Sequence, residues 1–187
     1  MSRYTEQELR DLGVKSLGKN VQISKKASLY GCENMVFGNN VRIDDFCVIS
    51  GKLVFGSYVH ITPYCLVAGG DEGVFFDDFT TLAYRCTVFT RSDDYSGDTI
   101  TNSMIPEEYR YKTIKEPVYI KKHAIAGAGS IIFPGCHLEE GVSLGANSLL
   151  IKPTEPWGMY VGSPAKRIKD RSKKLLEQEA DFLKKKC

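Results

Sequence analysis

The sequence predicts an all-β solenoid, in which short strands and tight corners wind into a stack of coils. A large apolar residue recurs at every sixth position from Phe37 to Val67 without a break. The position after it is Gly, Asp, Ser or Thr in each of these units, and the fifth position is Val, Cys or Leu. A helix would repeat its apolar residues every three to four positions and a lone strand every two, so neither explains a period of six.

A six-residue unit fits a short strand followed by a corner, because Gly, Asn and Asp adopt the turn conformations that other residues resist. Three such units close a triangular coil of 18 residues. Successive coils pair as parallel strands about 4.8 Å apart. The first and fifth positions then point inward, and each coil buries its apolar face only against its neighbours.

The period also divides the chain. It slips by three residues at Gly69, resumes at Phe76, is interrupted over 91–117, and runs from Ile120 to Leu150. A long loop inside a compact fold is usually functional or disordered, and its tyrosines favour packing or ligand contact. We therefore expect one domain, 1–187, with an N-terminal helix in 1–16, the solenoid in 17–151 with an excursion loop at about 91–117, and a C-terminal cap and helix in 152–187.

Both ends carry helix signals. Thr5 and Glu8 match a capping box that opens a short helix, and Gly13 closes it. Nine of the 25 basic residues fall in 165–186, which predicts a solvated capping helix. The apolar residues at helical spacing in this stretch are Ile168, Leu175, Leu176, Phe182 and Leu183.

Charge and hydropathy exclude several classes. The 25 Lys and Arg residues nearly balance the 23 Asp and Glu residues, for a net charge of +2, too low for a protein that mainly binds nucleic acid. No apolar run reaches the about 20 residues of a membrane helix. The first residues include no apolar segment that would serve as a secretory signal. We expect a cytoplasmic protein with no nucleic-acid partner and no stable membrane insertion.

The six cysteines form no CxxC pair, so a disulfide scaffold is not indicated. Cys47, Cys65 and Cys86 all occupy fifth positions, 18 and then 21 residues apart, and should stack in one interior column. Cys136 occupies a fifth position too. We interpret them as small apolar corner fillers.

Two motifs near the end of the repeat, 126–135 (AGAGSIIFPG) and 162–166 (GSPAK), make the chain resemble the hexapeptide-repeat acyltransferases. The resemblance covers about 17–171 and is nearest to galactoside and maltose O-acetyltransferases, and nearer still to acyltransferases of surface-polysaccharide genes. It implies a left-handed parallel β-helix, a homotrimer, and acetyl-CoA as co-substrate at the seam between subunits. No metal is expected.

The resemblance also implies a cofactor site. Small residues would let the pantetheine arm lie flush against the coil, and these are Gly127, Ala128 and Ala146. Fixed cations would bind the phosphates, and these are Lys152, Lys166 and Arg167. Trp157, which lies close in sequence to these cations, is expected to stack on adenine or sugar.

Catalysis needs a general base, and the galactoside-type enzymes carry a histidine in the long loop, where this chain has none between 91 and 117. We interpret His60, at an outward sixth position, as the catalytic base. Asp93 or Asp94 of the adjacent chain would orient it or the sugar. His123 and His137 are interpreted as solvated surface. The remaining acceptor contacts expected are Arg42, Asp44 and Thr62, which form a polar strip around His60, and Tyr84 and Tyr95, which would stack on sugar.

The leading functional prediction is acetyl transfer from acetyl-CoA to a sugar hydroxyl in glycan or surface-polysaccharide biosynthesis. The alternative is N-acetylation of a nucleotide-linked amino sugar, since an amine depends less on a dedicated base. Acylation of an antibiotic, a non-catalytic scaffold and a zinc site between subunits are weaker alternatives, the last because three histidines lack the clustering that zinc needs.

Overall fold

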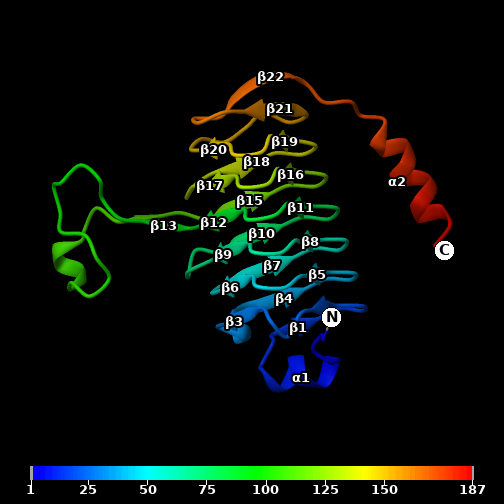
Figure 1. Ribbon diagram of the computed structural model, residues 1–187, viewed down its shortest axis with the longest axis horizontal. Coiled ribbons are helices and arrows are strands. Elements are labelled where there is room, and N and C mark those ends of the chain that lie inside the picture. The colour runs from blue at the N-terminus through cyan, green and yellow to red at the C-terminus, as the bar shows by residue number, and fades with distance from the viewer. Residues whose placement is uncertain (1, 187) are drawn as a thin grey trace.

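The computed structural model describes residues 2–186 and is a parallel β-solenoid of about seven turns (Figure 1). Sheet A contains β1 (Ser16–Leu17), β4 (Met35–Phe37), β7 (Leu53–Phe55), β10 (Val74–Phe76), β15 (Val118–Ile120) and β18 (His137–Leu138). Sheet B contains β2 (Gln22–Ile23), β5 (Arg42–Ile43), β8 (His60–Ile61), β11 (Thr81–Leu82), β16 (Ile125–Ala126), β19 (Ser143–Leu144), β21 (Gly158–Val161) and β22 (Lys166–Asp170). Sheet C contains β3 (Ser28–Tyr30), β6 (Val48–Ser50), β9 (Leu66–Ala68), β12 (Thr87–Phe89), β17 (Ile131–Ile132) and β20 (Leu149–Leu150).

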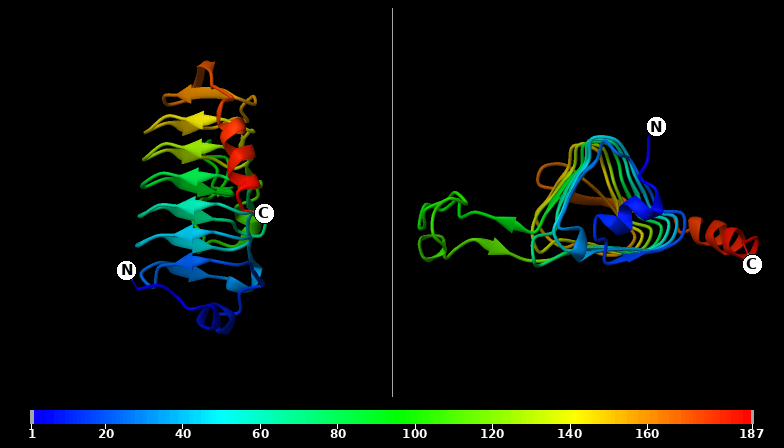
Figure 2. Two further views of the ribbon diagram at one scale, coloured as in Figure 1. Left: turned by 90° about the vertical axis from the view of Figure 1, so that its right-hand side faces the viewer. Right: turned by 90° about the horizontal axis from the view of Figure 1, so that it is seen from below.

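The three sheets are the walls of a triangular prism, seen end-on in Figure 2. We name its edges the A/B, B/C and C/A corners after the sheets that each one joins. Chain order fixes which corner a turn belongs to, because each coil runs from sheet A to sheet B to sheet C. The predicted solenoid is confirmed.

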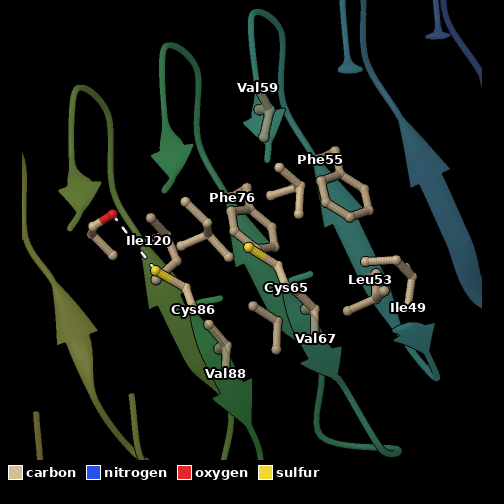
Figure 3. Close-up of a cluster of buried hydrophobic side chains, with 14 of the residues drawn as sticks. Ile49, Leu53, Phe55, Val59, Cys65, Val67, Phe76, Cys86, Val88 and Ile120 are labelled. Atoms are coloured by element: carbon tan, nitrogen blue, oxygen red, sulfur yellow. Dashed lines mark hydrogen bonds between the residues drawn. The ribbon is translucent and has the colours of Figure 1, made fainter. Parts of the chain in front are cut away.

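The core consists of the first and fifth positions of the repeat. Phe37, Phe55 and Phe76 are stacked, with ring centroids 4.9 Å apart between successive coils. Cys65 and Cys86 are buried beside them (Figure 3). Like residues form ladders because the parallel register places each position directly over its equivalent in the previous coil.

The cysteine column is also confirmed. Cys47 and Cys65 each donate a thiol hydrogen bond to the backbone of the next coil, to the carbonyls of Thr62 (3.1 Å) and Ala83 (3.2 Å). Burial raises the pKa of the Cys136 thiol to about 11, so it is neutral at pH 7. The five cysteines within residues 2–186 are free and buried, and Cys187 lies outside the described residues.

The N-terminal end of the prism is closed by α1 (Glu6–Asp11), with the predicted capping box between Thr5 and Glu8. Its residue Leu9 is 1% exposed and extends the core. A short 3-10 helix, η1 (Cys32–Asn34), precedes β4. Among residues 2–186, no helix has the length and apolar character needed to cross a membrane.

The C-terminal end differs from the prediction of one helix over 165–186. Residues Lys166–Asp170 form strand β22, antiparallel to β21, and α2 spans only Leu175–Lys184. The last coil has an unpaired strand edge, and β22 satisfies its backbone groups, which outweighs the helical spacing of Ile168. Ile168 is accordingly 56% exposed on the strand.

The predicted excursion loop leaves the prism after β12, at the C/A corner, and projects away from it (Figures 1 and 2). Strands β13 (Arg91–Ser92) and β14 (Ile114–Lys115) form its antiparallel neck, and η2 (Glu107–Tyr109) lies in its head. Asp94 organises the head by accepting backbone hydrogen bonds from Ser96 and Thr99, and bonds from these two residues lower the pKa of its carboxyl to about 2.

Candidate active site

A polar cluster lies on the outer face of sheet B. Arg42 on β5 and His60 on β8 are register partners, one coil apart. The carboxylate of Asp44 accepts a hydrogen bond from Arg42 Nε on Oδ1 (2.7 Å), and its Oδ2 lies 2.8 Å from His60 Nε2. The Asp44 side chain is 4% exposed, whereas those of Arg42 and His60 are 44% and 37% exposed. A buried carboxylate therefore holds two half-exposed cationic or titratable groups.

The repeat explains this arrangement. Arg42 and His60 are sixth positions, which point outward, and Asp44 and Thr62 are second positions just past the strand ends. The predicted polar strip is thus formed, with one addition: Asp44 of the same chain is the partner of His60. Parallel stacking brings the second position of one coil beside the sixth position of the next, a signal present in the sequence that the prediction did not use.

Thr62 adds an unsatisfied group to this cluster. It is 8% exposed, and its Oγ1 has no hydrogen-bond partner within residues 2–186. Buried hydroxyls without a partner cost free energy and are rare in folded proteins. Because this oxygen is also inaccessible to solvent, a ligand could reach it only after a local rearrangement.

A groove of about 420 Å³ follows the B/C corner from Tyr64, in the coil of His60, toward the C-terminal end. It brings together three predicted residues, Tyr84, Ala128 and Ala146. The other residues lining it are Tyr64, Arg85, Gly129 and Asn147. These four were missed from the sequence although all occupy fourth positions of successive units at one corner, a column that the period itself defines.

Gly127, beside the groove, is required by the fold. A Cβ at this position would lie 2.6 Å from the backbone nitrogen of Ala146 and 2.8 Å from the carbonyl carbon of Gly145. Both are backbone atoms of the next coil, which cannot move aside without breaking the stack. The corner geometry alone therefore explains this glycine.

The predicted phosphate-binding cations are not all together. The turn that contains Gly162 closes the C-terminal end of the B/C corner, where Gly162 N donates to Ser148 Oγ (3.1 Å), and Lys166 directly follows this turn. Arg167 is ion-paired with Glu155 (2.7 Å) and Asp170 (2.6 Å). Lys152 is exposed and follows β20, on the C/A side of its coil.

Trp157 lies at the A/B corner, away from the groove. Its ring packs where a Cβ on Gly141 would stand, and Lys173 Nζ lies 5.3 Å from the ring centroid. The structure therefore separates Trp157 from Ala128 and Ala146, with which it was predicted to share one ligand.

His123 is not solvated surface, contrary to the prediction. It is 8% exposed, its Nε2 lies 2.8 Å from Glu179 Oε2 of α2, and its ring stacks on Phe79 at 5.3 Å. The repeat could not reveal this burial, because α2 covers the corner from outside the coil. His137 is 38% exposed, as expected for surface.

Within one chain, the loop residues lie apart from the polar cluster around His60. These loop residues are Asp93, Asp94 and Tyr95. Asp93 accepts a hydrogen bond from Asn102 N (3.1 Å), Asp94 binds backbone amides of its own loop, and Tyr95 is 90% exposed. The loop starts at the C/A corner, whereas the groove follows the B/C corner, so the two flank opposite edges of sheet C.

Comparison with known proteins gives the family. No family model matches the chain. The dTDP-4-amino-4,6-dideoxy-D-glucose acyltransferase of Escherichia coli is 42% identical over 184 residues, which cover 97% of this chain and 95% of that enzyme. The chain belongs to the hexapeptide-repeat acyltransferases. The identity to the E. coli enzyme confirms the family and the enzyme class that were predicted for this chain.

Solved structures agree with this assignment. AntD is an N-acyltransferase from Bacillus cereus, solved in complex with dTDP and 3-hydroxybutyryl-CoA. It superposes on this chain with a TM-score of 0.96 and 44% identity, covering 98% of this chain and 97% of AntD. An AntD variant in complex with dTDP-4-amino-4,6-dideoxyglucose and coenzyme A matches equally well, with a TM-score of 0.96 and 45% identity over 98% of both chains.

Proposed function

We propose that this acyltransferase transfers an acyl group from acyl-CoA to the 4-amino group of dTDP-4-amino-4,6-dideoxyglucose. The observation that carries the proposal is 42% identity, along 97% of the chain, to an enzyme named for this acceptor. An AntD mutant, with a TM-score of 0.96, is in complex with the same amino sugar nucleotide and coenzyme A. An amino acceptor replaces the sugar hydroxyl favoured from sequence, because both relatives act on or bind a nucleotide-linked amino sugar.

The chemistry suits a site without a loop histidine. A neutral amine attacks the thioester carbonyl, a C–N bond forms, the C–S bond breaks, and coenzyme A leaves. One proton passes from nitrogen to sulfur in the balanced reaction. Because a neutral amine is a stronger nucleophile than a hydroxyl, it depends less on a general base to activate it before attack.

The groove at the B/C corner is the proposed site for the donor. Ala128 and Ala146 leave room for a thin chain, since any larger side chain would fill the groove that they line. Lys166, at the C-terminal end of this corner, would bind the phosphates of coenzyme A. His60 and Thr62, toward the N-terminal end, would then lie at the reacting end of the donor.

The loop would complete the acceptor site of a neighbouring chain. Sheet C presents half-exposed apolar side chains between the groove and the loop, among them Val48 (39%), Leu66 (37%) and Ile131 (37%). A neighbour that covers this face would bring Asp93, Asp94 or Tyr95 to the other chain's cluster. We therefore keep the homotrimer as part of the proposal, with a site shared between subunits.

The test is a thiol-release assay with acetyl-CoA and, separately, 3-hydroxybutyryl-CoA. The acceptors are dTDP-4-amino-4,6-dideoxyglucose and its matched analogue with a hydroxyl at carbon 4. We expect turnover with the amine only, and a product that resists hydroxylamine, as an amide does and an ester does not. Turnover with the hydroxyl analogue alone would contradict the proposal and restore the O-acetyl prediction.

A further inference from the structure

We infer that Asp44 is a positioning residue for acyl transfer: it holds His60 by Nε2, so that Nδ1 is the nitrogen that accepts the proton from the acceptor amine. The inference rests on the proposed N-acyl transfer and deepens it, because it assigns a tautomer and an orientation to the base. The sequence placed Asp44 among acceptor contacts; the geometry gives it a different task.

The hydrogen bonds of Asp44 leave one arrangement of protons. Arg42 Nε donates to Oδ1 (2.7 Å), and Oδ2 faces His60 Nε2 (2.8 Å). An ionised carboxylate accepts hydrogen bonds and donates none. His60 Nε2 must therefore carry the hydrogen, which leaves the lone pair of a neutral imidazole on Nδ1.

Burial makes this arrangement specific. The Asp44 side chain is 4% exposed, and the hydrogen bond from Arg42 Nε to its Oδ1 fixes the orientation of the carboxylate. The His60 side chain is 37% exposed, so a substrate can contact the imidazole from the solvent side. The charged groups that contact the imidazole or its partner in this cluster are Asp44 and Arg42.

The proton path then balances. After the amine attacks the thioester, the nitrogen of the intermediate loses a proton to His60 Nδ1. The C–S bond breaks, and the imidazolium returns that proton to the departing thiolate. Asp44 stabilises the transient imidazolium without itself being protonated, as the carboxylate does in other carboxylate–histidine pairs.

The first experiment needs no substrate. Nitrogen-15 NMR of the imidazoles in the full-length protein, with His60 assigned by its loss in His60→Gln, reports which nitrogen carries the hydrogen. We expect hydrogen on Nε2 in the wild type. In Asp44→Asn the side-chain oxygen still accepts from Arg42, the amide NH2 faces Nε2, and the tautomer inverts to hydrogen on Nδ1. Hydrogen on Nδ1 in the wild type would overturn the inference without any variant.

The matched control is Asp45→Asn, since the neighbouring carboxylate binds Ser24 and Lys26 instead of His60. It should leave both the tautomer and kcat unchanged. Asp44→Asn should lower kcat by about 10²–10⁴ with little change in KM for acyl-CoA, because a proton acceptor of the wrong tautomer binds substrate but cannot take its proton. An inverted tautomer with unchanged kcat would overturn the catalytic role. A wild type that acylates no amine would refute the proposed function while leaving the tautomer result intact.

Discussion

Two corners of the prism are built from the same repeat, but the aromatic side chains of one are covered and those of the other are exposed to solvent. At the A/B corner, Tyr58 and Phe79 stack at 4.7 Å, and Phe182 of α2 packs edge-on against both rings. At the B/C corner, Phe46 and Tyr64 stack at 5.1 Å in the same way, yet they remain 48% and 55% exposed. The chain covers one corner with its own helix and leaves the other open.

Side-chain size separates the two corners further along. Past the excursion loop, the A/B corner carries Lys122 and His123, which both pair with Glu179 of α2. The B/C corner carries Ala128 and Gly129 at the same positions of the next unit, and these line the groove. The repeat thus fixes where the corners are. The residues at the third and fourth positions decide whether a corner packs against the chain's own helix or is left open for a ligand.

The largest expected effect separates two histidines, His60 on the outer face of sheet B and His123 at the A/B corner. His60→Ala should lower kcat by about 10²–10⁴. It also leaves Oδ2 of the buried Asp44 without its partner, so the free energy of unfolding should fall by about 1–3 kcal/mol. Steady-state kinetics with dTDP-4-amino-4,6-dideoxyglucose and thermal unfolding measure the two quantities.

His123→Ala is the matched control, because it removes a histidine–carboxylate contact outside the proposed site. It removes a buried partner of Glu179 and should lower the free energy of unfolding by about 1–3 kcal/mol while kcat is kept. If His60→Ala keeps full kcat in a correctly assembled protein, the assignment of the base to the outer face of sheet B is wrong.

The next effect concerns the open groove. Ala128→Phe should fill it and lower kcat/KM for acyl-CoA at least about tenfold, with the fold intact, because the side chain points away from the packed core and each 1.4 kcal/mol of lost binding is a factor of ten. Ala180→Phe makes the same change on the exposed face of α2 and should leave kcat/KM as it is. Equal losses in the two variants would contradict a donor site at the B/C corner.

A smaller effect is expected at the covered corner. Phe182→Ala removes the edge contacts with Tyr58 and Phe79, and, since Phe182 is 38% exposed, should weaken the docking of α2 by about 1–2 kcal/mol. Hydrogen exchange of the α2 amides measures this local change, and kcat should stay at the wild-type value. A large loss of activity would mean that the covered corner also takes part in the reaction.

The smallest effect is a pH dependence of the same contact. Burial raises the pKa of Glu179, but hydrogen bonds from Lys122 and His123 outweigh it and hold the pKa below its ordinary value of 4.5. A depressed carboxyl pKa stabilises the docked helix above pH 4.5, and this stabilisation is lost as the pH falls through the lower value of the folded state.

Protection of the α2 amides should therefore decrease on acidification below about pH 4.5 in the wild type. Glu179→Gln, which cannot ionise, should show no such step. A step of equal size in both proteins would assign the transition to another group.

The sequence predicted the coil well and the additions to it poorly, for a physical reason. Contacts inside the solenoid repeat with a fixed period, so the positions of Cys47, Cys65 and Cys86 followed from counting. The burial of His123 and the strand at Ile168 depend on single contacts made by a segment outside the repeat. The six-residue period therefore could not predict them. In the candidate site, the period placed Arg42 beside His60 and gathered Ala128 with Ala146, whereas the pairing of Asp44 with His60 required side-chain geometry.

The central claim is that the open B/C corner, and not the corner under α2, binds the acyl donor. The most direct measurement is a crystal structure of this protein with coenzyme A. We predict the pantetheine chain along the groove lined by Ala128 and Ala146, with its thiol toward His60 and its phosphates toward Lys166. Coenzyme A bound instead against Tyr58 and Phe79, with the groove at the B/C corner unfilled, would contradict the account.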